Sequence, residues 1–211
     1  MGASSESVRR AEVAELVDTG ADAVRRGLVT ASGGNLSVRS TDGTFTVTSS
    51  GALLDRLDET LFTVMSLEGE VLAGNRAPSS EWKLHQRIYA ARPESVAVLH
   101  FHPQHAVLVD ALGYPIRMFT LDHRVYVRSV GIVPFFPNGS DELADSASEE
   151  AAEHECIVLR HHGCCVFGES VQAAYRRALN LEEAALATYR ALLLGDTTTT
   201  FPQDEQVLSH Q

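Results

Sequence analysis

The hydrophobic pattern of the chain switches between the period of helices and the period of strands. From Val8 to Leu28, apolar residues recur every three or four positions, which predicts an amphipathic helix. A second helix is expected to begin at the serines of "APSSEWKLHQRIYAARPE" and to stop at Pro93, and a long third one runs from Ser170 to about Leu194. Each of these helices presents an apolar stripe and therefore needs a partner layer that buries it.

Between the helices, the pattern shortens to strand-like runs bounded by turn residues. Asp42-Gly43 predicts a hairpin turn before "TFTVTSSG", and Glu68-Gly69 predicts a second turn within "LFTVMSLEGEVL". The apolar runs "SVAVLHFH" and "ECIVLRHHG" predict two buried strands, and a short helix follows the first of them after Pro103. Helices that alternate loosely with hairpins predict an α/β fold layered around a mostly antiparallel sheet.

Length and composition predict one globular domain. The 211 residues include 44% hydrophobic and 21% charged residues, so we expect a single domain over residues 1–211 with a polar tail from about residue 196. No apolar run approaches the roughly 18 residues of a membrane helix, and "MGASSESVRR" is not followed by the apolar core of a secretory signal. The expectation is a cytoplasmic protein without a membrane partner.

Charge and cysteine content narrow the choice of partner. A formal net charge of -11 argues against nucleic acid, because phosphate backbones are bound by clustered Lys and Arg. The three cysteines Cys156, Cys164 and Cys165 are odd in number and two of them are adjacent, which favours reduced thiols over a disulfide framework. An anionic small-molecule substrate is compatible with this composition where local donors bind it.

The histidines gather at the ends of the two buried strands. His100 and His102 stand two residues apart, so on a strand they project from the same face, although one such pair is more often hydrogen-bonded core than metal ligand. The second strand delivers His161 and His162 at its end in the same way. Three imidazoles with an open fourth position are typical of catalytic zinc. Spacing alone does not choose between His161 and His162.

An acid and three polar turns accompany these histidines. Glu81 stands at the predicted start of the second helix, where the helix dipole favours a carboxylate and where a base beside a metal would also serve. Serines and glycine-rich turns offer hydroxyls and free backbone N–H groups of the kind that cradle a phosphate without positive charge. They predict a phosphorylated small molecule as the substrate class. The residues that supply these groups are Ser32, Gly34, Asn35, Ser50, Gly51, Ser79 and Ser80.

Taken together, these motifs resemble the class II aldolase/adducin family. They occur in the family's order over roughly Glu12 to Leu194, and their combination is far more specific than any one alone. The motifs are "SGGNLSVR", "TSSGALLDRL", "PSSEWKLHQRIYAARPESVAVLHFH", "RHHGCCVFG" and "ALNLEEAALATY". The resemblance implies a three-layer α/β/α sandwich with a central, mainly antiparallel sheet, and a homotetramer with active sites at subunit interfaces.

The resemblance also assigns roles. It implies that one Zn2+ per subunit, or another divalent metal, is bound by His100, His102 and His162. It also implies that Glu81 is the catalytic residue, which ligates the resting metal and then acts as base. It implies that Ser79, Ser80 and the glycine-rich turns bind the phosphate. Family aldolases use a tyrosine from the adjacent subunit on the aldehyde oxygen, and here "MFTLDHRVYV" lacks a tyrosine at that position. Tyr126 is the candidate proton donor, with Asp122 and His123 as alternatives.

The expected activity is that of a carbon-carbon lyase. Within the family the motifs are most similar to aldolases that cleave fuculose 1-phosphate, which implies cleavage of a ketose 1-phosphate to dihydroxyacetone phosphate and an aldehyde in carbohydrate metabolism. Ribulose-phosphate 4-epimerases make the same cleavage but tend to carry aspartate in place of Glu81. Sugar-phosphate dehydratases and decarboxylases of the same fold share the glutamate. A non-catalytic adducin-like binding module is disfavoured, because a scaffold has no use for three histidines and an acid.

Overall fold

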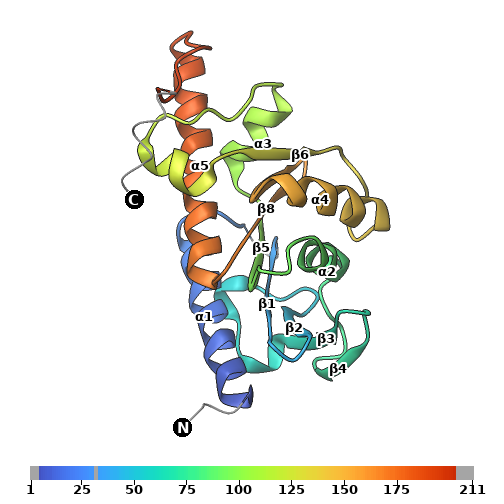
Figure 1. Ribbon diagram of the computed structural model, residues 1–211. Coiled ribbons are helices and arrows are strands. Elements are labelled where there is room, and N and C mark those ends of the chain that lie inside the picture. Colours follow the sequence, from blue (N-terminus) through green and yellow to red (C-terminus); the bar gives the residue numbers. More distant parts are fainter. Residues whose placement is uncertain (1–4, 31–32, 203–211) are drawn as a thin grey trace.

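A single mixed sheet forms the middle layer of the molecule (Figure 1). The computed structural model describes residues 5–30 and 33–202, and within them the sheet has eight strands in the order β4-β3-β2-β1-β5-β8-β7-β6. Neighbouring strands are antiparallel except β6 and β7, which are parallel. The strands are β1 (Asn35–Arg39), β2 (Thr44–Thr48), β3 (Phe62–Ser66), β4 (Val71–Gly74), β5 (Ala97–Phe101), β6 (Val130–Val133), β7 (Cys156–Leu159) and β8 (Gly163–Gly168).

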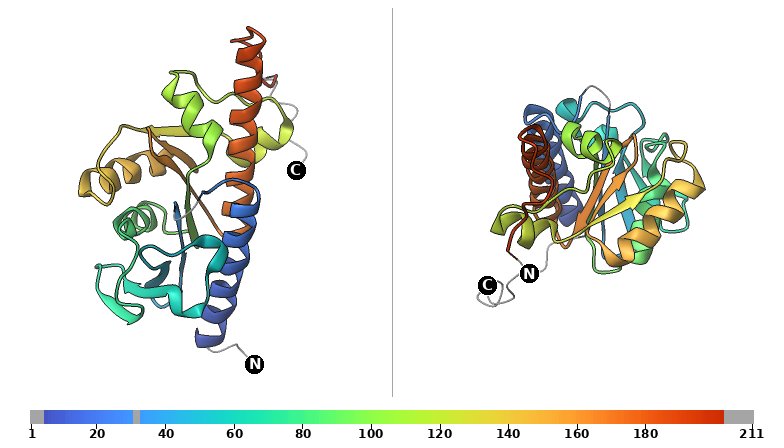
Figure 2. Two further views of the ribbon diagram at one scale, coloured as in Figure 1. Left: turned by 180° about the vertical axis from the view of Figure 1, so that it is seen from behind. Right: turned by 90° about the horizontal axis from the view of Figure 1, so that it is seen from above.

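Helices cover both faces of this sheet (Figure 2). The core on one face includes residues of α1, α3 and α5, and the core on the other face includes residues of α2 and α4. This is the layered α/β architecture that the sequence predicts, with the mainly antiparallel sheet in the centre. The helices are α1 (Ser5–Arg25), α2 (Trp82–Ala91), α3 (Gln104–Ala111), α4 (Asp141–Glu153) and α5 (Val171–Leu193), with short turns η1 (Leu54–Arg56) and η2 (Glu59–Leu61) and a π-helical segment η3 (His123–Val127).

Alternation along the central strands decides which side chains face which helix layer. On β5, Leu99 and Phe101 belong to the core beneath α1 and α5, whereas Val98 belongs to the core beneath α2 and α4. Since side chains two residues apart share a face of a sheet, His100 projects with Val98 toward α2. The sheet therefore turns its central histidine toward the helix that begins directly after Glu81.

Most predicted elements are present, and three are additional to the prediction. Both hairpins and all four predicted helices occur, and α2 begins at Trp82, two residues after the serines. The sequence reading did not identify β6, α4 and β8. Strand β6 has only four residues, and the buried face of α4 is built largely from alanines, so neither carries a strong apolar period.

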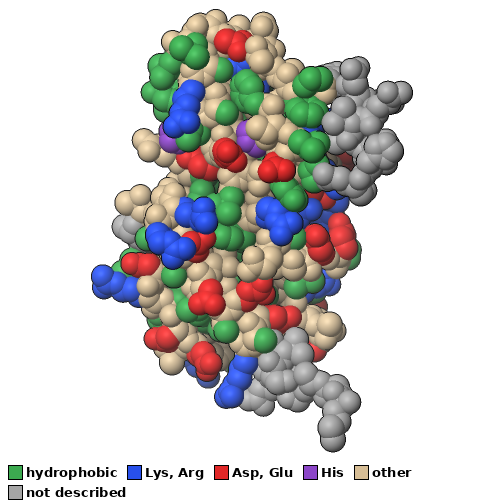
Figure 3. Space-filling model, turned by 90° about the vertical axis from the view of Figure 1, so that its left-hand side faces the viewer, with side chains coloured by type: hydrophobic (Ala, Val, Ile, Leu, Met, Phe, Trp, Pro, Cys, Tyr) green, Lys and Arg blue, Asp and Glu red, His purple; other side chains and the backbone are tan. Residues whose placement is uncertain are grey.

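The described helices and one face of the surface show how apolar and charged residues are distributed. No helix within the described ranges combines the length and the apolar character that crossing a membrane requires. On the face shown in Figure 3, Lys and Arg side chains are interspersed with Asp and Glu, and two histidines lie near the upper part. That face therefore presents a mixed charge distribution.

Candidate metal centre

Three histidine side chains converge at the end of β5 and the turn between β7 and β8. One ligand atom from each of His100, His102 and His162 lies within 4.8 Å of the others. Nε2 of His100 and Nε2 of His102 are 2.9 Å apart, and the three ring centroids are separated by 4.8, 4.9 and 5.1 Å. Strand β8 pairs directly with β5, so the turn that carries His162 lies beside the end of β5.

Two glycines, Gly163 and Gly34, leave the space that the three histidines need to converge. A Cβ built on Gly163 would lie 2.4 Å from the carbonyl oxygen of Phe101, 2.7 Å from Cδ2 of His102 and 2.9 Å from Cε1 of His100. Gly34 has φ +81°, and its Cβ would lie 2.6 Å from the carbonyl oxygen of His100. Only glycine fits at Gly163, because real β-carbons do not approach other atoms so closely.

The structure separates the two adjacent histidines. His161 has φ 56°, in the left-handed region, and its side chain is exposed. His162 is only 15% exposed and belongs to the cluster. The left-handed turn therefore directs consecutive residues to different surroundings, which the spacing alone did not reveal.

A buried carboxylate faces the cluster. Glu81, the residue preceding α2, is 4% exposed, and its Oε2 lies 3.2 Å from Nε2 of His100. Its Oε1 lies 3.5 Å from Nε2 of His162 and has no hydrogen-bond partner within the described part of the chain. Asn35 donates a 2.8 Å hydrogen bond from Nδ2 to Oε2 of Glu81.

Burial and mutual contact shift the pKa values of these groups. Burial by itself would raise the pKa of Glu81, but His100, His162 and the hydrogen bond from Asn35 together bring it well below its usual range. Burial, together with the charge on His100, lowers the pKa of His102 to about 4 and also lowers that of His162. For His100, burial lowers the pKa but the contact with Glu81 outweighs it, so the pKa is raised.

The donor set fits a divalent cation. Nδ1 of His100 lies 2.9 Å from the carbonyl oxygen of Cys164, so it carries the hydrogen and donates, which leaves the lone pair of Nε2 free for a metal. Three imidazole nitrogens and the unpartnered Oε1 of Glu81 then border one space, and nitrogen ligands with an adjacent carboxylate suit zinc.

The loops predicted to bind phosphate lie beside Glu81. Ser49 and Pro78 form a β-bridge, the N–H of Ser50 bonds to the carbonyl of Ala77 at 2.9 Å, and the N–H of Glu81 donates to Oγ of Ser79 at 3.2 Å. These contacts bring Ser50 and Gly51 together with Ser79 and Ser80 at the start of α2. Ser32 lies outside the described residues, and phosphate binding by the set stays a prediction.

Two other predicted residues have partners of their own. Asn35 uses both ends of its amide, because Nδ2 donates to Glu81 and Oδ1 contacts Nε2 of His85 at 2.5 Å. Tyr126 lies in η3, and its ring packs against the guanidinium of Arg176 on α5 at 5.1 Å. Its role as proton donor therefore stays a prediction.

The sequence reading missed His85, which is fully buried behind Asn35. The available signal was its position on the helix. His85 stands four residues after Glu81, so it lies on the same face of the helix one turn later.

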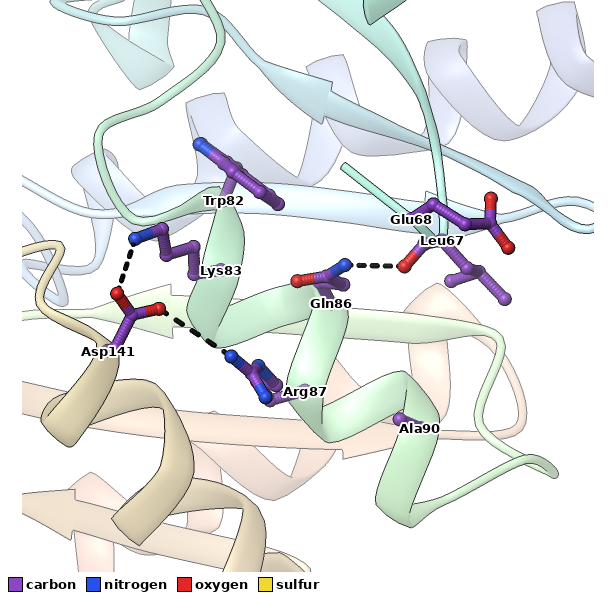
Figure 4. Close-up of a pocket in the computed structure, with 8 residues that line it drawn as sticks. All are labelled: Leu67, Glu68, Trp82, Lys83, Gln86, Arg87, Ala90 and Asp141. Atoms are coloured by element: carbon purple, nitrogen blue, oxygen red, sulfur yellow. Dashed lines mark hydrogen bonds and ion pairs between the residues drawn. The ribbon is translucent and has the colours of Figure 1, made fainter. Parts of the chain in front are cut away.

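A separate cavity lies along α2 (Figure 4). It has a volume of about 450 Å³, and its lining includes Trp82, Lys83 and Arg87. Lys83 and Arg87 both pair with Asp141, at 2.9 and 3.5 Å. The histidine cluster is not part of this lining, so the cavity is distinct from the candidate metal centre.

Most of the chain is similar in sequence to one family of known proteins. Residues 14–189 match the family described as the class II aldolase and adducin N-terminal domain. The chain belongs to the class II aldolase and adducin family. The 3-oxo-tetronate 4-phosphate decarboxylase of Pectobacterium atrosepticum is 34% identical over 199 residues, 92% of this chain and 89% of the relative.

Aldolases of the same family are also similar to the chain. The L-fuculose phosphate aldolase of Methanococcus maripaludis strain C5 is 31% identical over 171 residues, 81% of this chain and 92% of the relative. Among solved structures, an L-fuculose 1-phosphate aldolase superposes with a TM-score of 0.86 at 26% identity, covering 99% of this chain and 95% of that one. The relatives similar to this chain are thus named for two different reactions, a decarboxylation and an aldol cleavage.

Proposed function

We propose that the protein is a metal-dependent carbon-carbon lyase that releases dihydroxyacetone phosphate from a phosphorylated sugar or sugar acid. The observation that carries this proposal is a buried carboxylate, Glu81, that faces three converging imidazoles. His100, His102 and His162 would hold the cation, which we propose to be Zn2+, one per subunit. The family match and the sugar-phosphate relatives support the same reaction class.

Each group then has a role that follows from its position. The bound cation supplies Lewis-acid stabilisation of the negative charge that develops on substrate oxygens when the carbon-carbon bond breaks. Glu81, an ionised carboxylate, would take up a proton from solvent and pass it through its unpartnered oxygen Oε1 to the carbon that becomes C3 of dihydroxyacetone phosphate. The turns at Ser50 and Ser79 hold the phosphate with hydroxyl and N–H donors.

A lysine Schiff base is not part of this proposal. Lys83 is the only lysine of the chain, and its Nζ is paired with Asp141 at 2.9 Å beside the separate cavity. An amine that is charged and paired is a poor nucleophile for a ketone. The proposed reaction therefore relies on the metal and on Glu81.

The decarboxylation and the aldol cleavage named for the relatives differ in their leaving group. Aldol cleavage must remove a proton from the hydroxyl of the departing carbon, whereas loss of CO2 from a 3-keto acid needs no base for the leaving group. Tyr126, the candidate for that proton, packs against Arg176 in this structure. We therefore place decarboxylation of a 3-oxo-tetronate 4-phosphate first, supported by the 34% identical relative, and aldol cleavage of a ketose 1-phosphate second, supported by the fuculose phosphate aldolases.

The shared half-reaction gives the first test. Metal-loaded protein is incubated with dihydroxyacetone phosphate in D2O, and we expect proton NMR to show exchange of one C3 proton that stops after chelator treatment. Glu81→Gln is expected to keep the metal and lose the exchange. Exchange that persists in Glu81→Gln would remove Glu81 from the reaction, and no exchange in the metal-loaded parent protein would contradict the proposal.

Product analysis then separates the two leaving groups. Release of CO2 from 3-oxo-tetronate 4-phosphate with no cleavage of fuculose 1-phosphate would establish the decarboxylase. The opposite result would establish the aldolase. Turnover of neither substrate would exclude both named reactions.

The assembly and setting are part of the same proposal. We propose a homotetramer with active sites at subunit interfaces, in the cytoplasm. In the isolated chain, large apolar side chains are exposed at Phe135, Leu193 and Leu194, and the three cysteines are free thiols. Light scattering that gives the mass of one chain would contradict the tetramer.

A further inference from the structure

Five buried polar side chains form a continuous line from Glu81 into the layer between α2 and the sheet. Helix α2 and the residue before it present Glu81, His85 and Tyr89 at four-residue intervals, and β1 presents Asn35 and Ser37 at a two-residue interval. We name these five residues the polar ladder. All five are at most 5% exposed.

The polar ladder forms because the four-residue repeat of α2 and the two-residue repeat of β1 have nearly the same length. Four residues of helix rise about 6 Å and two residues of strand rise about 6.6 Å, so side chains from the two elements alternate along one line. Asn35 joins Glu81 to His85 with bonds of 2.8 and 2.5 Å. Ser37 joins His85 to Tyr89 with two bonds of 2.7 Å.

Chemistry sets the direction of every bond in the ladder. An ionised carboxylate only accepts, so Asn35 presents its NH2 group to Glu81 and its oxygen to His85. His85 therefore donates from Nε2, and its Nδ1 accepts from Ser37, which accepts in turn from Tyr89. Burial lowers the pKa of His85 to about 3, assisted by the charge on His100, and burial raises the pKa of Tyr89, so both groups keep these protonation states.

The two oxygens of the Glu81 carboxylate are therefore held differently. Oε2 of Glu81 receives the hydrogen bond of Asn35 and lies 3.2 Å from Nε2 of His100, while Oε1 faces His162 at 3.5 Å without a hydrogen-bond partner in the described chain. Rotation of the carboxylate would leave the donor of Asn35 unpaired in a buried place, and His85 keeps the Asn35 amide from flipping.

We propose that Asn35 and His85 are positioning residues that hold Glu81 by Oε2 and keep Oε1 directed at the metal and substrate. This inference rests on the proposed lyase function, because it assigns the orientation of the group that transfers the proton. Nothing in it requires Asn35 or His85 to touch the substrate.

A pair of substitutions at His85 tests the proposal. His85→Leu keeps a side chain of similar size but leaves Oδ1 of Asn35 without a donor. In His85→Gln, the side-chain N–H can donate to Oδ1 of Asn35 in place of Nε2 of His85. We expect His85→Leu to keep one metal per chain and to lower kcat roughly tenfold to hundredfold with KM within about threefold. His85→Gln should recover most of kcat.

A spectroscopic readout makes the test independent of turnover. Each variant is loaded with Co2+, and the visible absorption reports the surroundings of the metal. We expect the His85→Leu spectrum to move toward that of Glu81→Gln, and the His85→Gln spectrum to match the parent protein. A parent-like spectrum and a parent-like kcat in His85→Leu would overturn the proposal. So would a loss of kcat that is proportional to the fall in Tm and is equally large in His85→Gln.

Asn35 gives a second test, because it was also predicted to bind phosphate. A positioning role predicts that Asn35→Leu lowers kcat and changes the Co2+ spectrum, with KM for the phosphorylated substrate nearly unchanged. A rise in KM alone, with a parent-like spectrum, would overturn the positioning role in favour of phosphate binding. If the parent protein binds Co2+ but turns over neither substrate, the lyase proposal fails while the spectra still decide the role of the ladder.

Discussion

At the scale of single residues, the neighbours His161 and His162 differ most in what their loss should do. Only His162 belongs to the cluster, while His161 is exposed at φ 56°. We expect His162→Ala to lose metal after dialysis and His161→Ala to retain about one metal per chain, as measured by elemental analysis. Equal loss from both variants would contradict the assignment of His162 as a ligand.

Gly163 tests whether the cluster depends on close backbone packing. In Gly163→Ala the new Cβ would meet Phe101, His102 and His100 at 2.4 to 2.9 Å, so the strand ends must move apart. We expect unfolding to become easier by about 1 to 3 kcal/mol in urea titrations, together with lower metal affinity. Gly113→Ala is the control, because Gly113 has φ +79° and open space around it.

The control shows whether a loss of stability remote from the cluster is enough to change metal affinity. Gly113→Ala places a β-carbon in the left-handed region at a cost of about 1 kcal/mol, and it should leave metal affinity unchanged. Parent-like metal affinity in Gly163→Ala would show that the histidines tolerate a wider strand end.

The sequence predicted some of these residues and missed others for physical reasons. His100 and His102 follow from the two-residue repeat of a strand, and Glu81 follows from its place at a helix start. His85 was missed because a histidine inside an amphipathic helix resembles any polar core residue until the strand opposite it is known. Its partners Asn35 and Ser37 lie 50 and 48 residues away in the chain.

At the scale of elements, α5 supplies the missing N-terminal cap of α3. Helix α3 follows Pro103, which offers no side-chain cap, and the carboxylate of Glu182 accepts from the backbone N–H groups of His105 and Ala106, each at 3.0 Å. Glu182 is 17% exposed and also contacts Nδ1 of His105 at 2.7 Å. The segment that begins directly after His102 is thereby tied to α5.

Removing this cap should destabilise the fold. We expect Glu182→Ala to lower the free energy of unfolding by about 1 to 2 kcal/mol, because two N–H groups lose a charged acceptor near a helix N-terminus. Chemical denaturation measures this loss. Glu183→Ala is the control, since that side chain is 69% exposed, and we expect a change below about 0.5 kcal/mol. Similar losses in the two variants would argue against a capping role.

Elements with strong periods were predictable, and elements that depend on their neighbours were not. The turns at Gly43 and Gly69 have φ +81° and +94°, as the hairpin prediction requires. The sequence reading assigned no strand to Gly163–Gly168, yet β8 is a separate strand that pairs with both β5 and β7. Tertiary pairing, not local pattern, decides where the β7–β8 turn lies.

At the scale of the whole molecule, helices from opposite ends of the chain pack on the same face of the sheet (Figure 1). Residues of α1 and α5 share one hydrophobic core with strands of the sheet's centre. The sequence predicted that each helix buries an apolar stripe, but a stripe does not specify its partner. A hydrogen bond of 2.7 Å from Tyr175 to Asp22 joins the two helices across 153 residues of sequence.

This long-range bond makes part of the stability depend on pH. The hydrogen bond from Tyr175 lowers the pKa of Asp22; partial burial opposes this, and Arg26 and Arg25 lower it further. Because the folded pKa lies below the unfolded value of about 3.9, the contribution is fully present above that pH and is lost as the pH falls through the folded pKa. The contact between α1 and α5 should therefore become weaker at acid pH.

The sign of this effect can be measured with two variants. At pH 7 we expect Asp22→Asn to lower the free energy of unfolding by about 1 kcal/mol, because the charged acceptor of Tyr175 is lost. The difference from the parent should shrink as the pH falls below about 3.9 in urea titrations, since the parent carboxylate becomes neutral. Tyr175→Phe, which leaves Asp22 charged without its donor, should flatten the same pH dependence. A pH dependence unchanged in both variants would mean that the contact between α1 and α5 does not depend on the charge of Asp22.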